Sequence, residues 1–216
     1  MSFEMRAAAL LFDLDGTLVD STSLITRAWT RWAQEEGLTR ESFAGVALHG
    51  RPARDIVHDL LPDREVDGLR RINEIETSTP GGVRALPGTD ALLMTLGTER
   101  WAVVTSGSNA IAEPRLAVLP VRPPVVVTAD DVRHGKPDPE PYLLAARRLG
   151  ITDPSRCVVL EDAPAGLAAA SAAGMRSIAV VTTHRREDLE ATVVVSDLGW
   201  VHVRREVTEL VVEILD

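Results

Sequence analysis

The fold of this chain is decided by an apolar run that ends in two carboxylates, Ala7-Ala8-Ala9-Leu10-Leu11-Phe12-Asp13-Leu14-Asp15-Gly16. Its first residues are apolar without alternation, which predicts a strand buried on both faces, as strands of parallel sheets are. Polar residues follow immediately. The sequence therefore predicts a buried strand that carries Asp13 and Asp15 at its C-terminal end.

Similar short apolar runs recur at residues 102–104, 125–127, 157–160 and 178–181, with a further candidate at 193–195. Helical segments separate them. Residues 164–173, for example, have Pro164 in the first turn and end before Gly174. Strands that alternate with helices predict an α/β fold with a doubly wound, Rossmann-like parallel sheet.

Residues 21–78 interrupt this alternation, because their apolar residues have helical spacing and no convincing strand occurs among them. A return link rich in proline and glycine follows at residues 79–88. We therefore expect an α/β core of residues 1–18 and 86–216, with a small helical cap domain, residues 19–85, inserted after the first strand. Trp29 and Trp32 lie three positions apart and are expected to pack inside this insertion.

Composition restricts the classes of partner and location. The formal net charge of -9 argues against nucleic acid, which needs a basic face. No apolar stretch approaches the roughly 20 residues of a membrane span, and the N-terminal run is too short for a signal peptide. We expect a cytoplasmic monomer whose single cysteine, Cys157, is a buried thiol.

Polar residues follow several of the expected strands, at the edge where an open parallel sheet binds its ligands. Four carboxylates gathered there would repel one another unless a cation lay between them. Oxygen ligands that leave room for a substrate phosphate favour Mg²⁺. The residues expected to converge are Asp13, Asp15, Thr105, Ser106, Glu161 and Asp162.

Lys136 is the only lysine among 23 basic residues. Elsewhere the chain uses arginine, so a retained lysine indicates a position that needs a compact point charge. Chance retention on the surface explains the same fact equally well.

The whole set of motifs resembles the four ordered motifs of haloacid-dehalogenase-type phosphatases, and the similarity extends over nearly the whole chain. Within that family the sequence looks most like the β-phosphoglucomutase-like group, especially its sugar-phosphate and glycerol-phosphate phosphatases. The motifs are Asp13-Leu14-Asp15-Gly16-Thr17-Leu18-Val19-Asp20-Ser21, Thr105-Ser106-Gly107, Gly135-Lys136-Pro137 and Glu161-Asp162-Ala163-Pro164-Ala165-Gly166.

This resemblance implies that the protein is a Mg²⁺-dependent phosphatase for a small phosphorylated metabolite. It implies that Asp13 attacks phosphorus and that Asp15 acts first as acid and then as base. The metal ligands it implies are Asp13, the backbone carbonyl of Asp15 and Asp162, with Glu161 behind them. The phosphate-binding groups it implies are Thr105, the Ser106 amide and Lys136.

The insertion resembles the cap that closes over the active site in this group. Its segment Leu48-His49-Gly50-Arg51-Pro52 is similar to the loop that touches the substrate's leaving group. We therefore expect His49, Gly50 and Arg51 to select the substrate. An ordinary polar loop between two helices is the alternative.

Other activities share parts of this pattern. A phosphomutase would keep the same core, but β-phosphoglucomutases typically have a histidine and an arginine where this chain has Ile25 and Ala53. Because Arg51 and Arg54 are close to that position, the phosphomutase stays open as an alternative. Dehalogenases lack the second aspartate of the first motif. Phosphonate hydrolases of the group need a cap lysine, which this chain lacks. A non-catalytic module that binds phosphometabolites would not need both Asp13 and Asp15.

Overall fold

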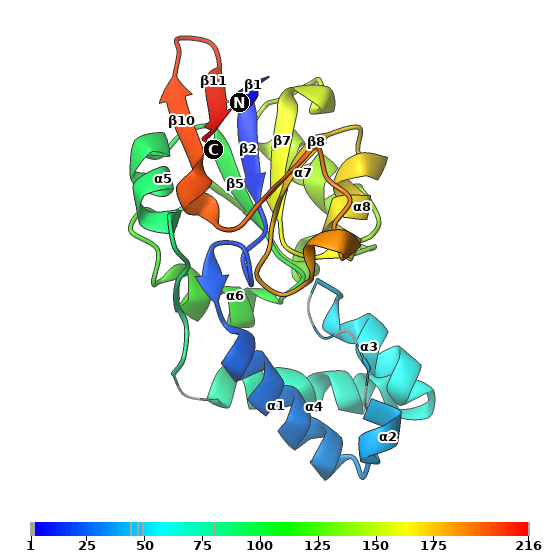
Figure 1. Ribbon diagram of the computed structural model, residues 1–216. Helices are drawn as coiled ribbons and strands as arrows, with labels where there is room; N and C mark the ends of the chain where they lie inside the picture. The colour runs from blue at the N-terminus through cyan, green and yellow to red at the C-terminus, as the bar shows by residue number, and fades with distance from the viewer. Residues whose placement is uncertain (1–2, 44, 47, 49, 80, 216) are drawn as a thin grey trace.

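The computed structural model describes residues 3–43, 45–46, 48, 50–79 and 81–215. A six-stranded parallel sheet of order β6-β5-β2-β7-β8-β9 forms its centre (Figure 1). The chain runs outwards from β2 to β5 and β6, then returns to β7, β8 and β9 on the other side. The predicted α/β fold is confirmed. The strands are β2 Ala9–Phe12, β5 Trp101–Val104, β6 Val125–Val127, β7 Cys157–Glu161, β8 Arg176–Val180 and β9 Val193–Val195.

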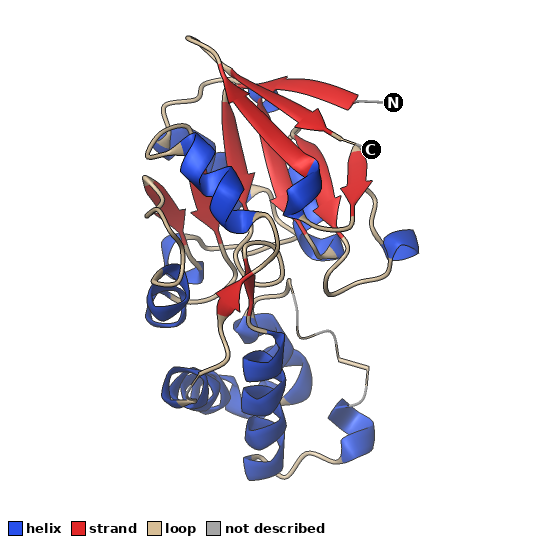
Figure 2. Cartoon of the chain, turned by 60° about the vertical axis from the view of Figure 1, so that its left-hand side comes forward, coloured by secondary structure: helices blue, strands red, loops and turns tan. Residues whose placement is uncertain are grey.

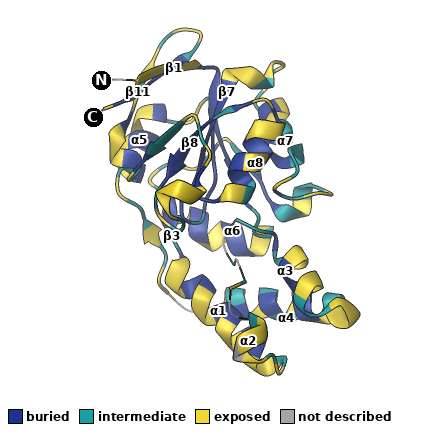
Figure 3. Ribbon diagram, turned by 45° about the vertical axis from the view of Figure 1, so that its right-hand side comes forward, coloured by how far each residue is buried: buried dark blue, intermediate teal, exposed yellow. Residues whose placement is uncertain are grey.

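Helices cover both faces of this sheet because its strands are apolar on both sides (Figure 3). Leu10 and Phe12 face one layer, where they pack with Leu93 of α5. Ala9 and Leu11 face the opposite layer, which contains residues of α7 and α8. The helices of the core are α5 Thr89–Leu96, α6 Asn109–Leu116, α7 Glu140–Arg148 and α8 Pro164–Ala172.

The first apolar run differs from the prediction, since it is divided between two sheets (Figure 2). β1 (Phe3–Ala7) pairs antiparallel with β11 (Leu210–Ile214), which pairs in turn with β10 (Val201–Arg205). Ala7, Ala8 and Ala9 are all buried, so burial continues through the bend between the strands. An unbroken apolar sequence therefore contained no signal for the break. The sequence of β10 does alternate in its first residues, and that signal was missed.

The insertion after the first strand of the parallel sheet is helical, as predicted, with its own apolar core. Trp29 and Trp32 pack edge to face, with ring centroids 5.2 Å apart. Trp32 Nε1 donates a hydrogen bond to the Gly68 carbonyl at 2.9 Å. The expectation that both tryptophans pack inside the cap is confirmed. Its helices are α1 Thr22–Glu35, α2 Arg40–Phe43, α3 Ala53–Leu60 and α4 Glu65–Ser78.

Both ends of the insertion meet in a two-stranded sheet. β3 (Val19–Asp20) pairs antiparallel with β4 (Arg84–Ala85). The cap helices lie below the carboxyl ends of the parallel strands in the view of Figure 1. Cys157 is buried in the core, as expected. Among the helices of the described residues, none combines the length and the apolar character that crossing a membrane requires.

Candidate active site

Asp13 and Lys136 form the buried centre of the site. Asp13 directly follows β2, and its amide donates to the Leu160 carbonyl of β7 at 2.9 Å, which holds the residue between two strands. Lys136 Nζ donates to Asp13 Oδ1 at 2.6 Å, to Glu161 Oε1 at 2.7 Å and to the Val104 carbonyl at 2.9 Å. The lysine is 1% exposed, so its chance retention on the surface is excluded. Burial lowers the pKa of Lys136, but the two carboxylates outweigh burial and hold this pKa well above its ordinary value.

Glu161, at the end of β7, is held through both of its oxygens. Oε1 also accepts from the Tyr142 hydroxyl at 2.9 Å, and Oε2 accepts from the amides of Asp162 at 2.9 Å and Ala163 at 3.0 Å. The Tyr142 ring lies 5.0 Å from Lys136 Nζ. Sequence reasoning gave Tyr142 no role, although it is the only tyrosine and lies in the α7 segment that follows Lys136.

Asp162 completes a cluster that can hold a metal ion. Asp13, Glu161 and Asp162 each offer a carboxylate oxygen, and these oxygens lie within 4.8 Å of one another. Thr17 Oγ1 donates to Asp162 Oδ1 at 3.2 Å, and the Thr183 hydroxyl donates to Oδ2.

The electrostatics of the cluster favour a bound cation. Burial, together with repulsion from Glu161, raises the pKa of Asp162 to about 7. Burial also raises the pKa of Asp13. Lys136 balances only one of the three carboxylate charges. A hard cation with oxygen ligands therefore fits the donor set.

Gly16 allows the backbone after Asp15 to pass close to the carboxylate of Asp162. Its backbone has a φ of +91°, in the left-handed region that favours glycine. A Cβ placed there would lie 2.2 Å from Asp162 Oδ2. No larger residue fits without moving the carboxylate.

The side chain of Asp15 lies outside that acidic cluster but borders a cavity between core and cap. Arg115 Nη1 donates to its Oδ2 at 2.6 Å, and the Ser21 hydroxyl donates to its Oδ1. Arg115 Nη2 also donates to Glu76 Oε2 at 2.8 Å. Sequence reasoning gave neither Arg115 nor Glu76 a role, since each reads as an ordinary charge on a helix.

Thr105 and Ser106 follow β5 at the rim of the cavity. Thr105 Oγ1 accepts a hydrogen bond from the Gly107 amide at 3.1 Å. Ser106 Oγ is buried and has no hydrogen-bond partner among the described residues. Such a hydroxyl needs a partner, and a phosphate oxygen in the cavity would provide one.

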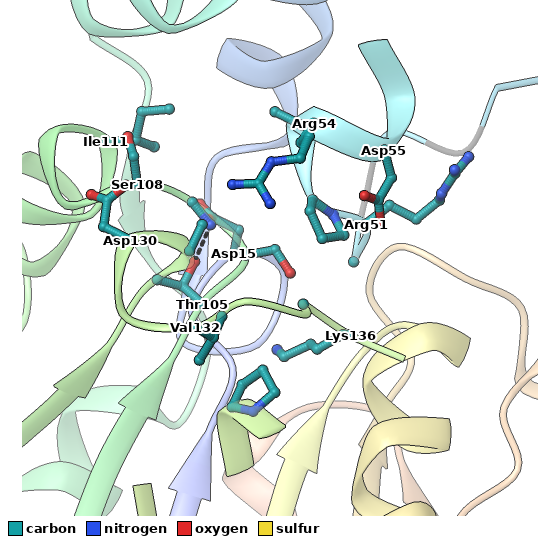
Figure 4. A pocket seen from close by; sticks show the side chains of 18 of the residues that line it. Asp15, Arg51, Arg54, Asp55, Thr105, Ser108, Ile111, Asp130, Val132 and Lys136 are labelled. Carbon is teal, nitrogen blue, oxygen red and sulfur yellow. Dashed lines mark hydrogen bonds between the residues drawn. The ribbon is translucent and has the colours of Figure 1, made fainter. Parts of the chain in front are cut away.

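The cavity between core and cap has a volume of about 770 Å³ (Figure 4). Gly50 and Arg51 border it, whereas His49 lies outside the described residues. Arg51 Nη2 pairs with Asp59 Oδ2 at 2.7 Å, and its side chain points away from the middle of the pocket in Figure 4. Arg54, in the first turn of α3, points into the pocket on the side of Asp15. From the core, the seven sequence-predicted residues that border the cavity or belong to the acidic cluster are Asp13, Asp15, Thr105, Ser106, Lys136, Glu161 and Asp162.

Comparisons with known proteins place this geometry in a family. Residues 7–174 match the model of the haloacid dehalogenase-like hydrolases. Hexitol phosphatase A of Escherichia coli is 45% identical over 184 residues, which cover 82% of this chain and 84% of that protein. Glycerol-1-phosphate phosphohydrolase 1 of Saccharomyces cerevisiae is 33% identical over 195 residues, which cover 83% of this chain and 76% of that protein.

Solved structures show the same fold. CbbY of Rhodobacter sphaeroides, crystallised in complex with phosphate, superposes with a TM-score of 0.76 at 27% identity, covering 89% of this chain and 95% of that one. A β-phosphoglucomutase from Clostridium difficile superposes with a TM-score of 0.73 at 24% identity, and the match covers 89% of this chain and 92% of that one. The chain therefore belongs to the haloacid dehalogenase-like hydrolases, and the resemblance of its motifs to the sugar-phosphate and glycerol-phosphate phosphatases of that family is confirmed.

Proposed function

We propose that this protein is a Mg²⁺-dependent phosphatase that hydrolyses the phosphate monoester of a small sugar or polyol through an aspartyl-phosphate on Asp13. One observation carries the proposal. A buried carboxylate, paired with a buried ammonium, stands at the floor of a cavity whose other core groups suit phosphate and a cation. The relatives named for hexitol and glycerol phosphates support the substrate class.

The residues of the core divide the reaction between them. Asp13 attacks phosphorus while the bond to the ester oxygen breaks, and Asp15 gives a proton to the departing oxygen. Asp15 then takes a proton from the water that attacks the acyl-phosphate, which releases phosphate and restores Asp13. Thr105 and the Ser106 amide bind phosphoryl oxygens, and Lys136 supplies the fixed positive charge beside them.

Asp13, Asp162 and the backbone carbonyl of Asp15 would hold Mg²⁺, and Glu161, fixed by its four hydrogen bonds, orients the groups around it. When bound, the ion neutralises the charge that the phosphoryl group and the carboxylates bring together. Because the acidic cluster lacks balancing charge, we expect activity to vanish in excess chelator.

The cap lining favours a phosphatase over a phosphomutase. Ile25 and Ala53 both border the cavity. Neither side chain carries a proton donor or a charge, so neither can serve a second sugar hydroxyl or a second phosphate. The charged cap residues Arg51 and Arg54 border the cavity too, so the preference for water as the acceptor rests on Ile25 and Ala53 alone.

The cap loop is proposed to select the organic part of the substrate. A Cβ on Gly50 would lie 2.3 Å from Cβ of Ala163, so this loop contacts the core directly beside the acidic cluster. His49, Gly50 and Arg51 belong to this loop. A cytoplasmic location and a monomeric state remain predictions.

Turnover of para-nitrophenyl phosphate with and without Mg²⁺ tests the activity, and Asp13→Asn tests the nucleophile. We expect release of nitrophenol only with both the metal and Asp13. A panel of sugar, polyol and nucleotide monophosphates, assayed for phosphate release, then ranks the substrates. Appreciable turnover by Asp13→Asn would overturn the mechanism, and preference for nucleotides would overturn the substrate class.

A further inference from the structure

Arg115 lies between the acid/base residue and the cap. It belongs to α6 of the core, and its guanidinium donates to Asp15 Oδ2 at 2.6 Å and to Glu76 Oε2 at 2.8 Å. Glu76 belongs to α4 of the cap. The side chains of Arg115 and Glu76 are 6% and 7% exposed, so this bridge is shielded from water.

The bridge leaves Asp15 little freedom to rotate. Arg115 occupies one carboxylate oxygen, and the hydroxyl of Ser21, directly before the first cap helix, occupies the other. One hydrogen bond comes from the core and the other from the entrance to the cap. The orientation of this carboxyl group therefore depends on how cap and core sit against each other.

Only arginine can make this connection as the structure shows it. Nη1 serves Asp15 and Nη2 serves Glu76, so the two nitrogens of one planar fork hold two separate carboxylates. Lysine, with a single nitrogen, would hold one of them well. Without any cation, two carboxylates would remain together in a buried place, which is costly.

We propose that Arg115 is a positioning residue, which orients the carboxyl group of Asp15 for proton transfer and makes this orientation depend on the seating of cap helix α4 through Glu76. The proposal rests on the acid/base role assigned above to Asp15. Movement of α4 away from the core withdraws Glu76 and releases Arg115 on that side. The acid is then in its working orientation only while the cap is seated.

The leaving group provides a test that a merely structural role would not pass. An alkoxide leaves with difficulty unless it is protonated, whereas nitrophenolate is a stable anion that departs without a proton. The ratio kcat/KM reports the steps up to the loss of the leaving group. A misplaced acid should therefore lower kcat/KM for an alkyl phosphate much more than for para-nitrophenyl phosphate.

We expect Arg115→Met to lower kcat/KM for the best alkyl phosphate of the panel by about a hundredfold, and for para-nitrophenyl phosphate by less than about fivefold. Arg115→Lys should recover part of the alkyl loss, since it restores one ion pair. Glu76→Gln should show the same split at roughly tenfold, because it removes only the charge on the cap side. Arg122→Met is the matched control, since Arg122 pairs with Glu113 at 2.7 Å in an exposed place and should behave as wild type.

Circular dichroism and thermal unfolding show whether each variant folds. If Arg115→Met does not fold, the proposal is tested with Glu76→Gln and Arg115→Lys. In these variants, kcat/KM for the alkyl phosphate should fall more than kcat/KM for para-nitrophenyl phosphate. Equal losses on both esters, with weaker inhibition by inorganic phosphate, would make Arg115 a phosphate-binding residue and overturn the proposal. Equal losses in kcat alone, or no loss, would overturn it as well. Failure of the proposed function is separate, because it would show as turnover by Asp13→Asn.

Discussion

Lys136 Nζ lies 2.6 Å from Asp13 Oδ1, in a place where the lysine is 1% and the aspartate 5% exposed. Asp13, the proposed nucleophile, is therefore paired with a fixed ammonium before any substrate arrives. The same ammonium also holds Glu161, so it joins the attacking group to the group that orients the acidic cluster.

This relationship predicts that no other side chain replaces Lys136. Lys136→Met should lower kcat/KM for para-nitrophenyl phosphate by about a hundredfold or more, the size of effect seen when one fixed donor to a transition state is lost. Lys136→Arg should fail as well, because a planar fork does not fit where a compact ammonium donates in three directions. Near-normal turnover by Lys136→Arg would show that any positive charge suffices.

Asp15→Asn tests the acid/base assignment. Asparagine keeps the shape and the backbone carbonyl but cannot exchange a proton, so the rate should fall by about a hundredfold or more. Circular dichroism and Mg²⁺ titration should remain close to wild type. A loss confined to KM would contradict this role.

Binding of Mg²⁺ should depend on pH through Asp162. In the metal-free protein the pKa of this carboxyl is raised from 3.8 to about 7 by burial and by Glu161. Between these values the folded protein holds a proton that the unfolded chain does not, so the stability of the metal-free protein falls as pH rises through this window.

Below about pH 7, Mg²⁺ must displace the proton on Asp162, so the affinity for Mg²⁺ should rise with pH. Above about pH 7 the carboxyl group is already ionised, and the affinity should level off. The increase in Tm on adding Mg²⁺ should therefore be larger at about pH 8 than at about pH 5.5. Equal increases at both values would show that Asp162 is not a ligand.

Gly16→Ala should damage the proposed metal site without replacing any of its ligands. The added Cβ would lie 2.2 Å from Asp162 Oδ2, and the backbone there has a φ of +91°, which alanine adopts only with strain. We expect the Mg²⁺ concentration for half-maximal activity to rise about tenfold or more. Gly174→Ala is the control for strain alone, since it also has a positive φ, +71°, but nothing lies within 4 Å of its Cβ.

Arg51 and Arg54 can be compared directly as selectors of the substrate. Arg51→Ala should lower kcat/KM for the preferred sugar or polyol phosphate far more than for para-nitrophenyl phosphate, because truncation leaves hydroxyls unpaired. Arg54→Ala is the informative companion, since Arg51 pairs with Asp59 while Arg54 points into the cavity. A selective loss in Arg54→Ala alone would transfer the role to that residue. An equal loss of kcat/KM on both esters would make Arg51 a phosphate-binding or structural residue. No loss on either ester would make it an ordinary loop residue.

Apart from Lys136, the parts of the core site that the sequence predicted are those at the ends of strands. Asp13, Thr105 and Glu161 each follow or end an apolar run, and parallel strands place such residues at one edge. The parts it did not predict depend on contacts across the fold. Arg115 and Glu76 are 39 positions apart, on helices whose charges resemble solvated ones until core and cap are brought together. The bend at Ala8 was hidden for a related reason, because the residues on either side are buried in different sheets.

The pairing of Val19 with Ala85 and of Asp20 with Arg84 has a consequence for how such a protein changes over evolutionary time. The chain leaves the core and re-enters it at adjacent points, so the fold of the core requires of the segment between them only that its two ends meet. A short turn or a different bundle of helices would satisfy that requirement, since the entropy of closing a loop grows only slowly with its length. The helical segment is thus an exchangeable module, and its replacement offers a route to new substrates, provided that the new segment supplies a partner for Arg115 in place of Glu76.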